Sequence, residues 1–192
     1  MAVEAVVFDV GETLVDETNM WTRVAHAGGV TPFTLMAGLG ATIALERPHS
    51  DVWELLRIEQ PAGSWTPDDW YPDALRCLAR LREQGFRIYA SGNMPAFVED
   101  DLRPHFDDVA SAERWAVWKP EAAFFQRVAG LAGAPPERIA YVGDRVDNDV
   151  VPALAAGMVA VHVRRGPWGY LQAPPPGAIR IDSLDELPEA LR

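Results

Sequence analysis

The sequence has one cysteine among 192 residues, which excludes an internal disulfide and any metal site built from cysteines. Cys77 lies among apolar residues at helical spacing, and this favours buried packing over a reactive thiol. No apolar run reaches the roughly 20 residues that a membrane span needs. The opening residues, MAVEAVVFDV, contain no basic leader. We therefore expect a cytoplasmic protein with no membrane partner.

Basic residues are also few. The chain has 17 Lys and Arg against 28 Asp and Glu, a formal net charge of -11. Clustered Lys and Arg bind the phosphate backbone of nucleic acids, and here the basic residues are scattered, so we expect no nucleic-acid partner. The length suits one α/β domain with a modest insertion.

What the sequence does contain is a series of extended apolar runs that alternate with amphipathic stretches. The predicted strands are residues 3–8, 86–90, 109–111, 139–142, 158–163 and 179–181. The predicted helices between them are residues 72–84, 95–103, 120–131 and 148–156. This alternation predicts an α/β fold, a Rossmann-like doubly wound parallel sheet that binds ligands at the carboxyl ends of its strands.

The stretch from Val15 to Trp70 breaks the alternation, because it signals three or four helices and no strand. We expect residues 15–70 to form a small helical insertion and residues 1–14 and 71–192 to form the core. Four of the seven tryptophans lie in the insertion, where we expect them to pack rather than to contact a ligand. Near the other end, RRGPWGYLQAPPPG predicts a surface loop and SLDELPEALR a closing helix.

Residues whose side chains are suited to catalysis or ligand binding follow the predicted strands, in four segments. Asp9 lies in VFDVGETL, Ser91 in YASGNM, Lys119 in WAVWKPEAAFF, and Asp144 and Asp149 in YVGDRVDNDV. Each has an ordinary explanation by itself, such as a helix cap, a turn or a solvated charge. Their order and their common place at the carboxyl ends of strands favour one site.

In this order the segments resemble the motifs of the haloacid dehalogenase-like (HAD) hydrolase superfamily, over essentially the whole chain. DVGETL, SGN, KP and GDRVDND carry the resemblance, and the helical insertion is similar to the family's α-helical cap. The resemblance implies a Rossmann-like core, Asp9 as the nucleophile, a Mg²⁺ ion and a small phosphorylated metabolite as substrate.

The chemistry of the residues agrees with these roles. A carboxylate such as Asp9 can form an aspartyl-phosphate, which water hydrolyses more easily than the original ester. Carboxylate and carbonyl oxygens are the ligands that Mg²⁺ prefers. The candidates are Asp9, Lys119 and Ser91 for catalysis, Ser91, Gly92, Asn93, Lys119 and Thr13 for substrate binding, and Asp9, Gly11, Asp144 and Asp149 for the metal.

Gly11 departs from the pattern, because most phosphatases of the family carry a second aspartate there, which acts as general acid and then as base. Such catalysis contributes typically about 10²–10⁴-fold. In the family, this position reaches the metal through its backbone carbonyl, which glycine keeps. The resemblance therefore implies metal and phosphate binding with impaired or relocated proton transfer. Glu12 is the nearest replacement, although neighbouring side chains on a loop point in different directions. A carboxylate from the insertion, such as Asp16 or Glu17, or a substrate whose leaving group needs no proton, is equally open.

Three classes of function remain open. The first is a Mg²⁺-dependent phosphatase or phosphotransferase. The second is a 2-haloacid dehalogenase, which needs no second aspartate but would need a carboxylate-binding arginine, Arg23 or Arg47. GDRVDND, which has the metal-binding form, argues against it. The third is a non-catalytic member that binds a phosphorylated ligand or a protein. Metal dependence separates the first two, and turnover separates both from the third. The sequence specifies neither the substrate nor the oligomeric state.

Overall fold

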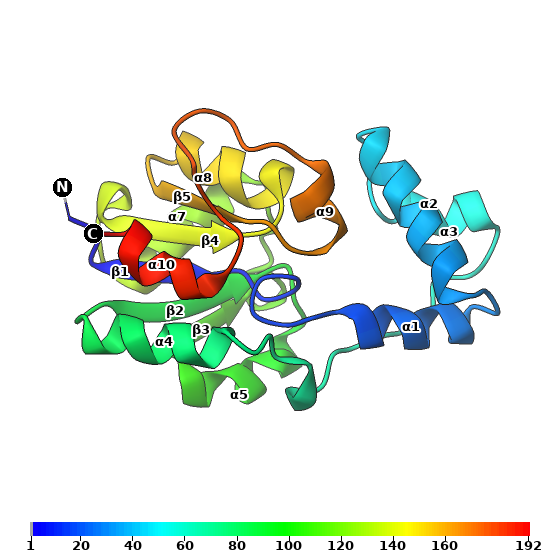
Figure 1. Ribbon diagram of the computed structural model, residues 1–192, viewed down its shortest axis with the longest axis horizontal. Coiled ribbons are helices and arrows are strands. Elements are labelled where there is room, and N and C mark those ends of the chain that lie inside the picture. The colour runs from blue at the N-terminus through cyan, green and yellow to red at the C-terminus, as the bar shows by residue number, and fades with distance from the viewer. Residues whose placement is uncertain (1) are drawn as a thin grey trace.

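The computed structural model describes residues 2–192, and its centre is one sheet of six parallel strands (Figure 1). The strand order is β3-β2-β1-β4-β5-β6, so the chain moves outward from β1 first to one side and then to the other. The prediction of a Rossmann-like doubly wound sheet is therefore confirmed. The strands are β1 (Ala5–Phe8), β2 (Arg87–Gly92), β3 (Asp108–Ser111), β4 (Ile139–Gly143), β5 (Val159–Val163) and β6 (Ile179–Ile181).

Register and burial explain how the sheet positions the predicted site. Phe8 pairs with Ala90 of β2 and with Val142 of β4, so the residues that follow these three strands emerge at the same edge. All four residues of β1 are buried, because helices cover both faces of the sheet. The covering helices are α4 (Ala74–Glu83), α5 (Glu99–Leu102) and α10 (Leu187–Ala190) on one face, and α6 (Ala112–Trp115), α7 (Ala122–Ala132) and α8 (Val151–Ala155) on the other.

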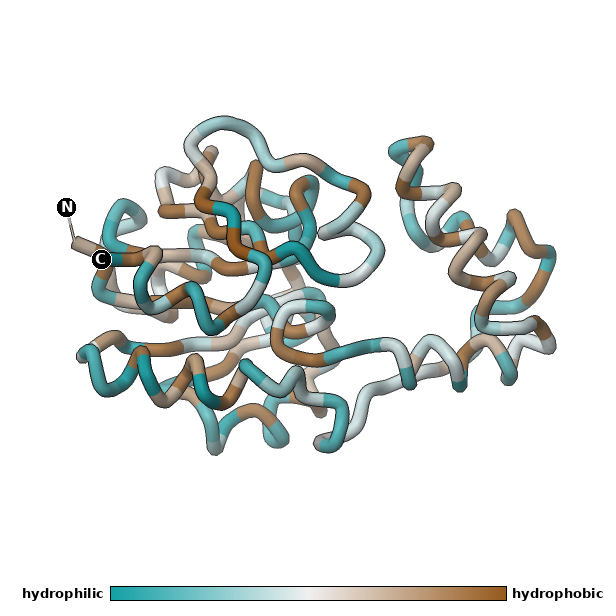
Figure 2. Tube along the Cα trace, in the orientation of Figure 1, coloured by the Kyte–Doolittle hydropathy of each residue, from teal (hydrophilic) through white to brown (hydrophobic). Residues whose placement is uncertain are grey.

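Three helices form a separate helical unit beside this edge of the sheet (Figure 1). They are α1 (Thr18–Ala27), α2 (Pro32–Ala44) and α3 (Asp51–Leu56). The unit has an apolar cluster of its own, so hydrophobic segments lie both in the strands and, apart from them, in α2 (Figure 2). An antiparallel bridge between Val15 and Trp70 closes the base of the unit.

No single helix of the described residues is long and apolar enough to cross a membrane. The pair α1 and α2, bent by 108°, passes the same test of length and composition.

Several predicted elements differ in the structure. The predicted loop 164–177 contains a helix, α9 (Gly166–Leu171), because Trp168 is buried against the helical unit and Pro167 suits a first helical turn. In place of the helix predicted for residues 95–103, residues 96–105 form three consecutive short segments, with α5 between two 3₁₀ turns. Residues 146–150 form a π-helical turn ahead of α8. The closing helix is reduced to a 3₁₀ turn followed by α10.

Candidate active site

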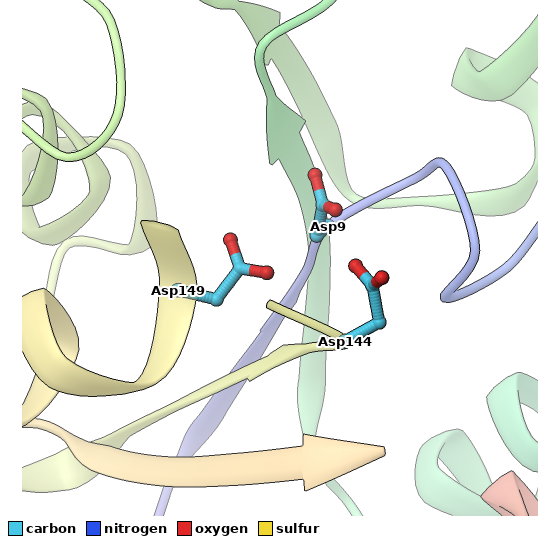
Figure 3. Close-up of side chains that lie close together, drawn as sticks. All are labelled: Asp9, Asp144 and Asp149. Carbon is cyan, nitrogen blue, oxygen red and sulfur yellow. The ribbon is translucent and has the colours of Figure 1, made fainter. Parts of the chain in front are cut away.

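The four predicted segments meet at the carboxyl edge of the sheet. Asp9 directly follows β1, Asp144 directly follows β4, and Asp149 lies in the π-helical turn ahead of α8. Figure 3 shows their carboxylates facing a common centre, and one oxygen from each lies within 4.8 Å of the other two. All three residues are buried, with Asp149 fully so.

Lys119 is the only lysine in the chain, and it joins two of these carboxylates. Its Nζ donates to Asp9 Oδ1 and to Asp149 Oδ1, both at 2.7 Å. Burial by itself would lower the pKa of Lys119, but the charges of Asp149 and Asp9 raise it well above its ordinary value. Asn93 fixes the backbone here, since its Oδ1 accepts from Lys119 N–H at 2.8 Å and its Nδ2 donates to the Lys119 carbonyl at 3.1 Å. Lys119 therefore stays a positioned ammonium group.

The carboxylate cluster is suited to a divalent cation. Burial, followed by the charges of Asp149 and Asp9, raises the pKa of Asp144 well above its ordinary value. Asp144 Oδ2 is buried and has no hydrogen-bond partner within residues 2–192. The one ammonium of Lys119 thus contacts only two of the three buried carboxylates, and a hard cation such as Mg²⁺ would supply both the missing charge and the missing partner. Asp149, by contrast, uses both carboxylate oxygens in hydrogen bonds, because its Oδ2 also accepts from Arg145 N–H at 2.9 Å.

Two glycines allow these carboxylates to approach the strand ends closely. A Cβ at Gly92 would overlap Asp9 Oδ1, and a Cβ at Gly143 would overlap the Asp149 carboxylate. Gly92 was predicted from the sequence as a substrate-binding residue. Its position shows in addition that a larger residue would not fit beside the Asp9 carboxylate.

Ser91 and Thr13 lie in the interior of the protein rather than at its surface. Both are fully buried, and neither hydroxyl has a hydrogen-bond partner in the described part of the chain. The Ser91 carbonyl accepts from the Tyr141 hydroxyl at 2.8 Å, and the Thr13 carbonyl accepts from Arg165 Nη1 at 2.9 Å. Their roles in substrate binding stay predictions.

A cavity of about 200 Å³ opens between the sheet edge and the helical unit. Of the predicted site residues, Asp9, Gly11, Asn93, Lys119 and Asp144 line it, while Ser91, Gly92, Thr13 and Asp149 lie outside its lining. The other lining residues are Glu12, Glu17, Met20, Trp21, His49, Arg145, Asn148 and Trp168.

Three cavity residues that the sequence analysis missed contact one another. The Arg145 guanidinium lies 4.8 Å from the centre of the Trp168 ring, and the His49 ring meets Trp168 edge-on with centroids 6.0 Å apart. The sequence could have pointed to Arg145, because this residue lies inside the motif GDRVDND. His49 and Trp168 are far apart in the sequence and belong to no motif. Trp21, expected to pack, both stacks on Trp53 and lines the cavity.

Two carboxyl groups lie close to Gly11. Glu12 is buried, with Oε1 accepting from Glu17 N–H at 3.1 Å and Oε2 from the Tyr71 hydroxyl at 2.6 Å. Burial raises the pKa of Glu12. Burial, and then the charge of Glu12, raises the pKa of Glu17 to about 8. Asp16 does not line the cavity and instead accepts from Thr18 N–H at the start of α1.

Residues 3–157 match the family model of haloacid dehalogenase-like hydrolases. The chain is 29% identical over 128 residues to a glyceraldehyde 3-phosphate phosphatase of Methanocaldococcus jannaschii, a match that covers 64% of this chain and 56% of that protein. It is 36% identical over 155 residues to enolase-phosphatase E1 of a Bradyrhizobium species, which covers 74% of this chain and 64% of that protein. The chain thus spans only about half to two thirds of these curated relatives.

Solved structures show the same fold. The HAD-hydrolase YfnB of Bacillus subtilis, bound to magnesium, superimposes with a TM-score of 0.74 at 16% identity, and the match covers 100% of both chains. The L-2-haloacid dehalogenase of Xanthobacter autotrophicus superimposes with a TM-score of 0.72 at 19% identity over 99% of this chain and 98% of that one. The family match over most of the chain, together with this fold, shows that the protein belongs to the haloacid dehalogenase-like hydrolases.

Proposed function

We propose that this hydrolase is a Mg²⁺-dependent phosphatase that acts on a small phosphorylated metabolite through an aspartyl-phosphate on Asp9. The observation that carries the proposal is the Lys119 ammonium, 2.7 Å from Asp9 Oδ1, beside the buried carboxylate of Asp144. A nucleophilic carboxylate, a fixed cation and a cation-binding cluster are what attack on an anionic phosphate ester requires.

The chain's own residues divide the work in this proposal. Asp9 attacks phosphorus, the leaving oxygen departs, and water then hydrolyses the aspartyl-phosphate and regenerates the carboxylate. Lys119 holds Asp9 in place and offers positive charge to the phosphoryl group. Asp9, Asp144, Asp149 and the Gly11 carbonyl would hold the metal ion. When bound, the ion supplies positive charge that stabilises the transferring phosphoryl oxygens.

The cavity favours a small substrate. About 200 Å³ leaves room for a phosphoryl group and a short carbon skeleton. Arg145 and His49 also line the cavity, and both side chains can donate hydrogen bonds to polar groups of that skeleton. The names of the relatives agree with this size, since they include phosphatases of glyceraldehyde 3-phosphate, phosphoserine and phosphoglycolate.

The dehalogenase alternative is less well supported by the cavity. Neither arginine proposed for it lines the site: Arg23 donates to the Ser64 carbonyl at 2.7 Å, and Arg47 pairs with Asp51 at 2.8 Å near the surface. The likeness to solved dehalogenases is below 25% identity and concerns the fold alone.

A panel of phosphorylated metabolites and 2-haloacids, assayed with Mg²⁺ and with EDTA, tests the proposal. We expect Mg²⁺-dependent release of phosphate from small substrates and no release of halide. Asp9→Asn should abolish turnover while the protein stays folded, because it removes the nucleophile. Metal-independent halide release would support a dehalogenase, and binding of phosphates without any turnover would support the non-catalytic class.

A further inference from the structure

The volume that a side chain at residue 11 would occupy is already filled by a carboxyl group. A Cβ built on Gly11 would overlap Glu17 Oε1 and would lie 2.8 Å from Glu17 Cδ. The Glu17 carboxyl therefore reaches, from six residues further along the chain, the space directly beside Gly11. It also lines the same cavity as Asp9 and Lys119.

The position of Glu17 is fixed from both sides. Its backbone N–H donates to Glu12 Oε1 at 3.1 Å, and its Oε2 accepts from Trp21 Nε1 at 3.1 Å, one turn along α1. Trp21 in turn stacks on Trp53 within the helical unit, with ring centroids 6.3 Å apart. Within the described residues Glu17 Oε1 takes part in no hydrogen bond, so this oxygen is free to face a ligand in the cavity.

Glu12, although adjacent to Gly11, is placed for a different task. Both of its carboxylate oxygens already accept hydrogen bonds, from Glu17 N–H and from the Tyr71 hydroxyl. Its φ of 51° also turns its backbone into the left-handed region, where a non-glycine residue is uncommon. Glu12 is thus a positioning residue for Glu17.

We infer that Glu17, the residue that directly precedes α1, is the proton-transfer residue that takes the place of the side chain missing at Gly11. The inference rests on the proposed phosphatase function. In the first step Asp9 forms a bond to phosphorus, the bond from phosphorus to the leaving oxygen breaks, and that oxygen takes the proton of the Glu17 carboxyl. In the second step water attacks the aspartyl-phosphate, its proton passes to the Glu17 carboxylate, and phosphate and the Asp9 carboxylate are released.

The substitution Glu17→Gln tests the inference, because it keeps the size of the side chain and its ability to accept from Trp21. We expect kcat on an alkyl phosphate such as glycerol phosphate to fall by about 10²–10⁴-fold, the usual contribution of general acid catalysis. With p-nitrophenyl phosphate, whose leaving group needs no proton, the first turnover should persist as a rapid burst of nitrophenol. Only later turnovers should slow, because the aspartyl-phosphate then lacks its base.

Two further variants complete the test. Glu54→Gln makes the same chemical change at an exposed residue of the helical unit and should leave both substrates unaffected. Gly11→Asp combined with Glu17→Ala places a carboxyl on residue 11 after space has been made for it, and it should recover alkyl phosphatase activity that Glu17→Ala lacks.

The outcomes separate this inference from the function on which it rests. Unchanged hydrolysis of alkyl phosphates by Glu17→Gln would overturn the role of Glu17 and leave the phosphatase intact. Equal loss of the nitrophenol burst and of alkyl turnover would mean that Glu17 only supports the structure, and would also overturn its role. Wild-type protein that hydrolyses no phosphate ester or acyl phosphate with Mg²⁺ would overturn both proposals.

Discussion

The two walls of the cavity are built in different ways. On the sheet side, Asp9, Lys119 and Asp144 are at most 8% exposed. Asp9 and Asp144 directly follow two strands paired in parallel register, and Asn93 holds the backbone of Lys119. On the other side, Met20 and His49 come from a small helical unit with an apolar cluster of its own. A rigid sheet edge can hold charges at fixed separations, and a separately packed unit can change its lining without disturbing that edge.

This difference indicates how the work is divided. In the function we propose, the sheet edge carries the nucleophile Asp9 and the charges that phosphoryl transfer needs. In the same proposal, the helical unit carries residues that face the carbon skeleton of the substrate and, by our inference, the proton for the leaving group. The two walls are joined by Trp168 of α9, which packs into the helical cluster, and by the hydrogen bonds of Glu12.

The largest effect is expected for Lys119→Met on the sheet side. Removing the ammonium leaves Asp149 buried and unpaired, and breaking a buried ion pair in this way costs about 3–5 kcal/mol. We expect urea unfolding at neutral pH to show a loss of this size, together with loss of phosphatase activity.

Arg138→Met is the matched control for Lys119→Met, because Arg138 pairs with Glu4 at the surface, where ion pairs contribute about 0–1 kcal/mol. If both variants lost equally little stability, the sheet edge would not depend on its ammonium group.

An intermediate effect is expected for the metal response. An ion that binds only the folded state at 100 times its Kd stabilises it by about 2.7 kcal/mol, which raises the Tm of a domain of this size by roughly 5–10 °C. Asp144→Asn should remove most of this rise. Without metal this variant should melt no lower than wild type, because the raised pKa of Asp144 means that its charged form is unfavourable in the folded protein.

Asp147→Asn makes the same change on the same loop, where Asp147 pairs with Arg145 rather than joining the carboxylate cluster. It should keep the rise in Tm with Mg²⁺. An unchanged response in Asp144→Asn would place the ion elsewhere.

The sheet side was also the part that the sequence predicted best. Runs such as Val6 to Phe8 are buried on both faces of the sheet and are therefore apolar throughout, and motif residues such as Asp9 follow directly where such runs end. The boundaries of the six strands differ from the predicted ones by at most two residues.

The helical side could not be predicted to the same depth, because its structure depends on contacts between distant residues. Gly and Pro around Trp168 predicted a loop, yet burial of this one indole against the helical unit stabilises α9. The sequence left Glu12, Asp16 and Glu17 open as replacements for the missing aspartate. Their directions depend on the turn after Gly11 and on the start of α1, and no periodicity encodes either one.

The smallest effect concerns the link between the two walls, and Tyr71→Phe would test it. The Tyr71 hydroxyl, on the core side, donates to Glu12 Oε2 at 2.6 Å, and Glu12 Oε1 holds the backbone of Glu17. Losing this bond to a buried carboxylate should lower the free energy of unfolding by about 1.5 kcal/mol. Because Glu17 would be held less firmly, kcat on alkyl phosphates should fall several-fold while the nitrophenol burst changes less. Tyr170→Phe, at an exposed tyrosine of α9, is the control. An equal fall for both substrates would show that the bond contributes only to stability and does not help to place the proton donor.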